Sequence, residues 1–449
     1  MVFGAACGAR SSLRDVAGTG AGSGGSGAGA TATSAAATSA TTGPGSGPGG
    51  GPSFACPSLA SVEPQVEVPT SAGTTAARDP LLQRLGNEDV LALVRGEKGP
   101  MSSSPQSTIA AVRLEPWGTW PPTIHPPTVV YQLGWNIPFV SSVEPGGTIA
   151  LGIEPFPQNN PLGCDIAAIF GLSPEAPAPD ALTVHLKGSC DDTPRGVATL
   201  NNGLQLVAAD LAWNSGGGPK RRWAVRVFNA GVELTPTPPS VCASTPIVGD
   251  VLAAGEEFLF VHSAGGKEDC GDVATPASPA RRLVVERRAK GAKSNTVVYE
   301  GVDDIIHAQL LPRTGGAWLL FRESGASALV QPPGMAMPLG ADDAPGEAFQ
   351  VTEPGTGSMS AAALGDGFVV AFVDSIDPSA PTISVRVYSA TGTLASQVSF
   401  TTGEGWYNGD RLTLVASPNG ASFLVGWTGL KSPVGSALFV RRFDCFTPL

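Results

Sequence analysis

The sequence predicts an all-β fold: a single seven-bladed β-propeller that follows a disordered N-terminal tether and is closed by its own N-terminal strand. Three observations predict it. From about residue 55 onward, short apolar segments alternate with turn residues, with almost no helical periodicity. A short strand motif recurs along these segments. Its copies are about 55 residues apart on average, which is typical of a propeller with several strands per blade.

The tether comes first in the chain. Residues 17–53 contain only Ala, Gly, Ser, Thr and Pro. Such a tract has no large apolar side chains whose burial could offset the loss of backbone entropy, so we expect it to be disordered. Its root-mean-square reach is roughly 35 Å. We therefore divide the chain into a signal-peptide remnant (1–7), a tether (8–54) and a propeller (55–449).

The recurring motif has the form Val-Arg-apolar. Clear copies lie at 112–114, 225–228, 385–388 and 440–443, and weaker ones at 184–186, 283–288 and 327–333. A more apolar strand precedes most copies, at 89–96, 256–263, 317–324, 367–375 and 421–429. Tight-turn residues introduce each apolar strand, as expected for hairpins. Seven such units fill residues 62–449.

Ring closure is predicted from the two ends of this region. The last motif ends at Phe443, which leaves no room for the outermost strand of the last blade. The apolar segment 64–70 can supply that strand, so we expect residues near 60 and near 445 to lie side by side. Cys56 and Cys445 stand at these two places, and we predict that a disulfide joins them.

The remaining cysteines also suggest pairs. Cys164 and Cys190 bracket one candidate hairpin, and Cys242 and Cys270 bracket another, so each pair would meet at the open end of its hairpin. Three disulfides require an oxidising compartment. The alternative is that these cysteines are independent free thiols.

Cys7 remains without a partner in this scheme. The segment "VFGAACG" around it resembles the cleavage box of bacterial lipoproteins, in which the cysteine becomes the lipidated first residue of the mature protein. It departs from that pattern at Gly4, where a leucine is usual, and it lacks a basic segment and a full apolar stretch. The alternative is an ordinary exposed cysteine in a disordered tail.

Together, the lipobox-like Cys7, the tether and the predicted propeller resemble exported bacterial β-propeller lipoproteins of undefined role. The resemblance implies a location in the bacterial cell envelope, in the outer membrane or periplasm, or secretion. The net charge of −11 excludes long-range attraction to nucleic acid or anionic lipid. No run of about 18 apolar residues is present. Membrane contact is therefore expected only through the N-terminal lipid.

Catalytic, metal and cofactor motifs are absent from the sequence. The four histidines, His125, His185, His262 and His307, are far apart, and there is no nucleophile elbow, phosphate-binding loop or dinucleotide fingerprint. We therefore assign no catalytic, metal-binding or cofactor-binding residues. The acidic pairs at 191–192, 303–304 and 342–343, and the basic clusters at 220–223 and 281–293, are expected to be solvated.

Two aromatic loops are the candidates for ligand binding. Trp117 and Trp120 lie among prolines in 116–127, and Trp406 and Tyr407 lie between turn residues in 403–410. A loop tryptophan can stack on a sugar or anchor a protein contact, but it can equally fill the gap between two blades. The long connections after the apolar strands are expected to share one face, where a ligand would bind.

These features favour a non-enzymatic binding or scaffolding module for a protein or glycan of the envelope. One alternative is a secreted propeller enzyme that acts on polysaccharide through loop carboxylates at the mouth of the central channel. Another is a structural envelope component that binds no small ligand.

Overall fold

The computed structural model describes eighteen segments of the chain. They are residues 56–70, 76–85, 88–98, 106–133, 139–145, 147–153, 166–173, 181–186, 192–215, 218–234, 242–265, 278–289, 292–325, 331–374, 381–402, 405–406, 412–432 and 435–446. All of them belong to one compact unit, Pro52–Leu449. The predicted lipobox and tether therefore lie outside the described residues.

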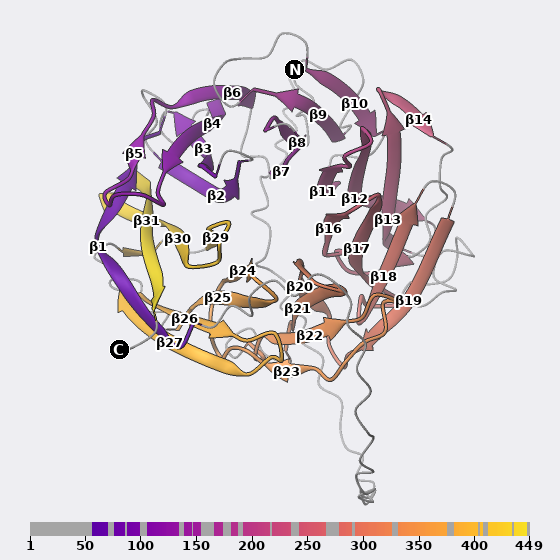
Figure 1. The fold of residues 1–449 in the computed structure, drawn as a ribbon. Coiled ribbons are helices and arrows are strands. Elements are labelled where there is room, and N and C mark those ends of the chain that lie inside the picture. Colours follow the sequence, from indigo (N-terminus) through magenta and orange to yellow (C-terminus); the bar gives the residue numbers. More distant parts are fainter. Residues whose placement is uncertain are drawn as a thin grey trace, which may run out of the picture. The chain divides into compact units, whose positions relative to one another are not determined.

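The described chain is all-β, and its strands form six hydrogen-bonded sheets (Figure 1). The largest sheet has ten strands and combines the two ends of the propeller region. Its strands are β1 (Ser58–Val68), β2 (Ala76–Arg84), β3 (Val90–Lys98), β4 (Gln106–Glu115), β5 (Thr123–Ile124), β6 (Thr128–Leu133), β28 (Gly405–Trp406), β29 (Thr413–Ala416), β30 (Ser422–Ser432) and β31 (Gly435–Phe446).

The other five sheets follow one another along the chain, each built from consecutive strands that pair antiparallel. The second and third sheets contain β7 (Phe139–Val143), β8 (Ile149–Ile153), β9 (Ile166–Leu172) and β10 (Leu182–Leu186), then β11 (Thr193–Thr199), β12 (Leu204–Ser215), β13 (Gly218–Asn229), β14 (Val232–Leu234) and β15 (Cys242–Ala243). The fourth contains β16 (Gly249–Ala254), β17 (Glu257–Ala264), β18 (Arg282–Ala289) and β19 (Ala292–Glu300). The fifth and sixth contain β20 (Ile305–Arg313), β21 (Gly316–Glu323), β22 (Met335–Leu339) and β23 (Phe349–Gln350), then β24 (Met359–Leu364), β25 (Gly367–Val373), β26 (Thr382–Tyr388) and β27 (Leu394–Thr401).

The sheets stand around a common centre as the blades of a β-propeller (Figure 1). In five of the sheets the first strand lies toward that centre, and in the ten-stranded sheet β2 and β29 do. These inner strands contact one another in the order β2, β7, β11, β16, β20, β24, β29 and back to β2. Within the ten-stranded sheet, a single residue pair, Ala76 with Ser436, joins β2 to β31. That sheet therefore consists of two groups of strands with one link between them.

The N-terminal strand closes the ring, as the sequence predicted. β1 pairs antiparallel with β31 from Ser58 opposite Phe446 to Val68 opposite Leu438. Cys56 and Cys445 form a disulfide at the end of this pairing, which confirms their predicted bond. The first and last parts of the propeller region are thus held together both by strand pairing and by a covalent bond.

Most predicted strands match observed ones, and two assignments were wrong. All five predicted apolar strands coincide with observed second strands, namely β3, β17, β21, β25 and β30. In the fifth sheet, the third strand is Met335–Leu339 and not the predicted 327–333. In the second sheet, the motif at 184–186 lies in the outermost strand, β10, and the third strand is β9. Almost every residue of β9 is buried, so this strand packs between β8 and β10 although it lacks the Val-Arg motif.

The core is divided into layers between neighbouring sheets. One cluster packs β25 and β26 against β29, β30 and β31, and includes Cys56. Another packs β3 and β4 against β8 and β9. Alternate residues of each central strand face opposite neighbours, so these strands are apolar on both faces. The described residues include no helix long and apolar enough to span a membrane.

Candidate functional site

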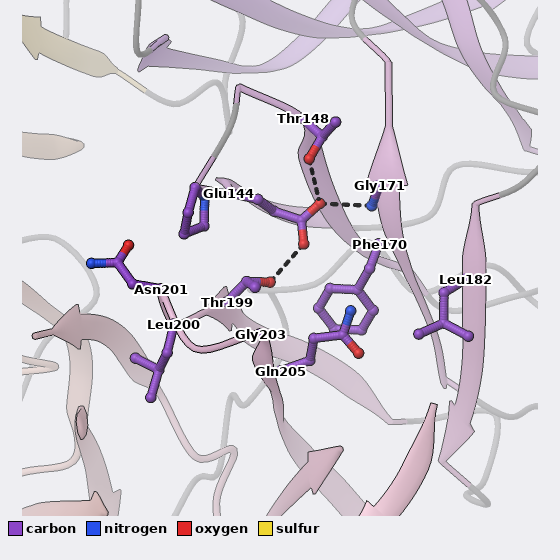
Figure 2. Close-up of a pocket in the computed structure, with 11 residues that line it drawn as sticks. Glu144, Thr148, Phe170, Gly171, Leu182, Thr199, Leu200, Asn201, Gly203 and Gln205 are labelled. Atoms are coloured by element: carbon purple, nitrogen blue, oxygen red, sulfur yellow. Dashed lines mark hydrogen bonds between the residues drawn. The ribbon is translucent and has the colours of Figure 1, made fainter. Parts of the chain in front are cut away.

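A cavity of about 320 Å³ lies between the second and third sheets, at the end where tight turns join the first and second strands (Figure 2). Its size is at the small end of the range typical of ligand sites, about 300–1,000 Å³. Eleven residues line it: Glu144, Pro145, Thr148, Phe170, Gly171, Leu182, Thr199, Leu200, Asn201, Gly203 and Gln205. They come from β9 to β12 and from the turns after β7 and β11.

Glu144 is the only charged residue among the described residues of this lining, and its carboxylate accepts three hydrogen bonds. The backbone N–H of Gly171 donates to Oε2 at 2.6 Å, and the Thr148 hydroxyl donates to the same oxygen at 3.0 Å. The Thr199 hydroxyl donates to Oε1 at 2.6 Å (Figure 2). Glu144 is only 7% exposed. The carboxylate therefore joins the second sheet to the third and holds the wall of the cavity in place.

A bulge in β9 makes the Gly171 N–H available. Ile149 pairs with Leu172 and Leu151 pairs with Ile169, so two residues of β9 stand opposite one of β8. Gly171 has φ of +78°, which suits the glycine position of a β-bulge. Because the bulge releases this N–H from the strand ladder, a side-chain acceptor is needed, and Glu144 supplies it.

The two turns that frame the cavity have the same hydrogen bonds. In the first, the N–H of Glu144 donates to Thr148, and the N–H of Gly147 donates back to Glu144. In the second, Leu200 and Leu204 pair in the same way, with Gly203 in the position of Gly147. Both glycines have positive φ. Because the two turns are equivalent, Glu144 in the second sheet and Asn201 in the third lie at the same end of their sheets.

Two side-chain amides complete the polar part of the lining. Asn201 is exposed at the rim, while Gln205 is half-buried in β12. Apolar contact comes from Phe170, which is 1% exposed, and from Leu182, which is half-buried (Figure 2). The arrangement offers hydrogen-bond donors and acceptors around a small apolar wall.

The predicted candidates Trp117 and Trp120 have a packing environment. Both are half-buried against the core of the first sheet. The indole N–H of Trp117 donates to the carbonyl oxygen of Glu88 at 2.5 Å, and that of Trp120 donates to the carbonyl oxygen of Pro64 at 2.6 Å. Arg442 fixes the same loop by donating to Pro116 at 2.8 Å and Gly118 at 2.9 Å. The loop thus attaches the closing strand to the first sheet.

Several other predicted residues fall outside the described part of the chain. The backbone of Trp406 forms β28 and pairs with Gly429, whereas Tyr407 is not among the described residues. Cys7, Cys164, Cys190 and Cys270 are outside them as well. Cys242 is disulfide-bonded, and its pairing with Cys270 stays a prediction because Cys270 is not described.

Buried charged and polar residues occupy one level at the opposite end of the sheets, where the second strands end. The residues are Arg95, Asp210, His262 and Arg322, which stand opposite Arg78, Thr193, Gly249 and His307 on the inner strands. Asp210 accepts from Arg221 at 2.6 Å, and His262 lies 3.0 Å from Glu286. Arg322 donates to the hydroxyls of Thr352 and Thr356, and burial lowers its pKa to about 10.

These contacts correct part of the expectation that the acidic pairs and basic clusters are solvated, although Asp342 and Arg281 are exposed as expected. Asp192 and Lys220 are almost fully buried, and Asp343 is buried with Arg287 donating to it at 2.7 Å. Arg287 and Asp343 pair between the fourth and fifth sheets, whereas Asp192 accepts from the backbone N–H of Ala212 within the third sheet. The long connections beyond this level mostly lie outside the described residues, so a ligand site on that face stays a prediction.

The described segments contain no group of three or more His, Cys, Asp or Glu side chains that could hold a metal ion. His125 contacts Glu115 at 2.7 Å, and His185 is exposed on β10.

Sequence reasoning missed the residues of the cavity. Glu144, Gly171 and Gln205 come from three separate strands or turns, and no local motif singles them out. The only signal was the turn-forming composition of residues 144–148, and such a composition is common to many hairpin turns.

No family model matches the chain, and no curated protein matches it either. Solved structures similar to it include a protein of unknown function from Dyadobacter fermentans, at 12% identity and a TM-score of 0.49, covering 86% of this chain and 99% of that one. Another is an α-L-arabinanase from Penicillium chrysogenum complexed with arabinobiose, at 13% identity and a TM-score of 0.49, covering 87% and 100%. The C-terminal WD40 domain of Sif2 matches at 12% identity and a TM-score of 0.42, covering 84% and 98%. Such low identities and scores carry no conclusion about the activity of this chain.

Proposed function

We propose that the protein is a non-enzymatic binding module of the bacterial cell envelope, with a seven-bladed propeller held on a lipid-anchored tether. The cavity beside Glu144 is the observation that carries the binding role. The one charged group among its described lining residues, Glu144, accepts three hydrogen bonds and joins two sheets, so it positions the wall and is not free to act as an acid, base or nucleophile. The partner is a protein or glycan of the envelope.

Seven blades are supported by the cycle of inner strands. β2 and β29 both belong to the ten-stranded sheet, yet each stands in its own place in the cycle, and only the pair Ala76–Ser436 joins their two groups. Counting these groups separately gives one blade for every inner strand.

Anchoring through Cys7 is supported by where the closing strand begins. Cys56, directly after the tether, is bonded to Cys445 and precedes β1. Tension arriving along the tether would reach this covalent closure before it could peel β1 from β31. A disulfide also fits the oxidising compartment to which a lipoprotein is exported.

Binding and turnover can be tested on the same material. The full-length protein with its disulfides intact is incubated with polysaccharides and protein extracts of the envelope, and both retained material and new reducing ends are measured. We expect saturable binding without release of reducing ends. Catalytic release of reducing ends would contradict the proposal and favour the polysaccharide enzyme, and absence of any retained partner would also contradict it.

A further inference from the structure

We propose that the cavity between the second and third sheets binds a neutral sugar residue, with the side-chain amide of Gln205 accepting a hydrogen bond from one of its hydroxyls. This inference rests on the proposed binding function and names the chemistry of its ligand. It is carried by three properties of the cavity: an acceptor without a partner, the distribution of charge, and the shape of the apolar wall.

The unpartnered acceptor is Oε1 of Gln205. This oxygen is buried and has no hydrogen-bond partner among the described residues. Gln205 sits on β12 directly opposite Thr199, whose hydroxyl is already committed to Glu144. A buried acceptor without a donor costs free energy, and native proteins rarely keep one unless water or a ligand satisfies it. Because this oxygen has almost no accessible surface, the Gln205 side chain must turn toward the cavity before an O–H or N–H of a ligand can supply the missing donor.

The charge of the lining disfavours an anionic ligand. Among the described residues that line the cavity, Glu144 is the only charged one, and none is Lys, Arg or His. The chain as a whole also carries a net charge of −11. A carboxylate or phosphate brought beside the buried Glu144 carboxylate would be repelled and would find no cation to replace its water.

A cationic ligand is disfavoured because the Glu144 carboxylate already accepts hydrogen bonds from the protein. Its two oxygens accept from Gly171, Thr148 and Thr199, so they offer little to an ammonium group. The Phe170 side chain is 1% exposed and presents no open ring face to a cation. A neutral ligand avoids the desolvation of a charge and still satisfies Gln205.

Sugar chemistry suits the remaining groups. Asn201 at the rim and Gln205 inside each carry both a donor and an acceptor, which matches hydroxyls that donate and accept at once. Leu182 supplies a small apolar wall for the C–H side of a ring. The lining lacks the large apolar recess that would anchor a peptide side chain, so a glycan is the better match.

The test is calorimetric titration of the full-length, disulfide-intact protein. The probes are methyl glycosides of glucose, galactose and mannose, each beside its uronic acid and its 2-amino sugar. Two variants accompany the wild type: Gln205→Leu, which removes the acceptor, and Gln397→Leu, which changes an exposed glutamine on β27 and serves as the matched control. Far-ultraviolet circular dichroism and unfolding curves verify that both variants fold.

We expect at least one neutral glycoside to bind, its charged counterparts to bind at least about tenfold more weakly, and Gln205→Leu to weaken binding by about tenfold while Gln397→Leu leaves it unchanged. Tighter binding of an amino sugar or uronic acid, equal binding by Gln205→Leu, or no binding of any neutral probe would overturn the proposal. Envelope partners that are retained equally by wild type and Gln205→Leu would leave the binding module standing and remove only this site. Loss of all partners would remove both.

Discussion

At the scale of single residues, Glu144 is the group on which the cavity depends. Three donors from two sheets converge on its carboxylate. They are the backbone N–H of Gly171 and the hydroxyls of Thr148 and Thr199. Removing the acceptor leaves a buried N–H and two hydroxyls to find new partners, and that cost falls on the folded state alone.

Glu144→Ala is therefore expected to lower the free energy of unfolding by about 2–4 kcal/mol. Glu144→Gln is the matched control, because its amide oxygen can still accept from Gly171 and Thr148 while its NH₂ group donates to Thr199. It should cost less than half as much. Urea unfolding followed by tryptophan fluorescence measures both. Equal stability of Glu144→Ala and wild type would contradict the structural role of this carboxylate.

Asp250 provides a test of pH dependence. Burial raises the pKa of this carboxyl from 3.8 to about 6, against the lowering effect of hydrogen bonds from the N–H groups of Leu310 and Val251. The folded protein thus binds a proton that the unfolded chain has already released between pH 3.8 and about 6. The contribution of Asp250 to stability falls as the pH rises through this window.

Asp250→Asn removes that titration. The variant loses one acceptor at every pH, but its stability relative to wild type should increase between pH 4 and pH 7, since the wild type alone bears the rising cost of a buried charge. Thermal unfolding at several pH values measures the difference. A stability difference that stays constant across this range would show that Asp250 does not titrate as described.

At the scale of elements, the closing strand and the aromatic loop form one assembly. β1 pairs with β31 and with no other described strand, so contacts outside the strand pairing also hold it in place. The indole N–H of Trp120 holds Pro64 of β1, and Arg442 of β31 holds the backbone of the loop. The loop thus fastens the closing strand on the side where the ladder provides no partner.

Trp117→Phe and Trp120→Phe are each expected to destabilise the protein by about 1–2 kcal/mol, because each removes an indole N–H donor while keeping an aromatic ring. Amide hydrogen exchange in residues 58–68 should rise most in Trp120→Phe. Binding of envelope partners should be unchanged in both. Normal stability with lost binding would instead support the original ligand-binding interpretation of these tryptophans.

The Cys56–Cys445 bond should matter more than any single contact of the closure. It spans a sequence separation of 389 residues, and closing so long a loop restricts the unfolded chain strongly. Cys56→Ser with Cys445→Ser is expected to lower the free energy of unfolding by about 2–5 kcal/mol. Reduction of the wild type should cost at least as much, because it also opens the bond that Cys242 makes. An unchanged unfolding midpoint in the double variant would mean that β1 is held by its strand pairing alone.

At the scale of the whole molecule, repetition explains how much could be predicted. A repeat of about 55 residues, alternating apolar strands and a missing outer strand were enough to predict the propeller and its closure by residues near 60 and 445. The failures came where repeats diverge: β9 carries no Val-Arg motif, and the third strand of the fifth sheet is Met335–Leu339, which follows the predicted position.

The cavity could not be predicted in the same way, because it depends on contacts between repeats. Glu144 is a turn residue in sequence, and its role appears only when the bulge at Gly171 and the next blade's Thr199 stand beside it. Gln205 likewise has no sequence signal, since an unpartnered acceptor is a property of the packed structure. Trp117 and Trp120 were visible as unusual residues, yet their surroundings favour packing over recognition.

The intact mass of the protein from its native membrane fraction, with and without reduction and alkylation, tests most directly whether the propeller is an exported and tethered module. We predict a mature chain that begins at an acylated Cys7 and exposes its other six cysteines to alkylation only after reduction. An unmodified chain that begins at Met1 and presents seven free thiols would contradict both the anchor and the disulfide-closed ring.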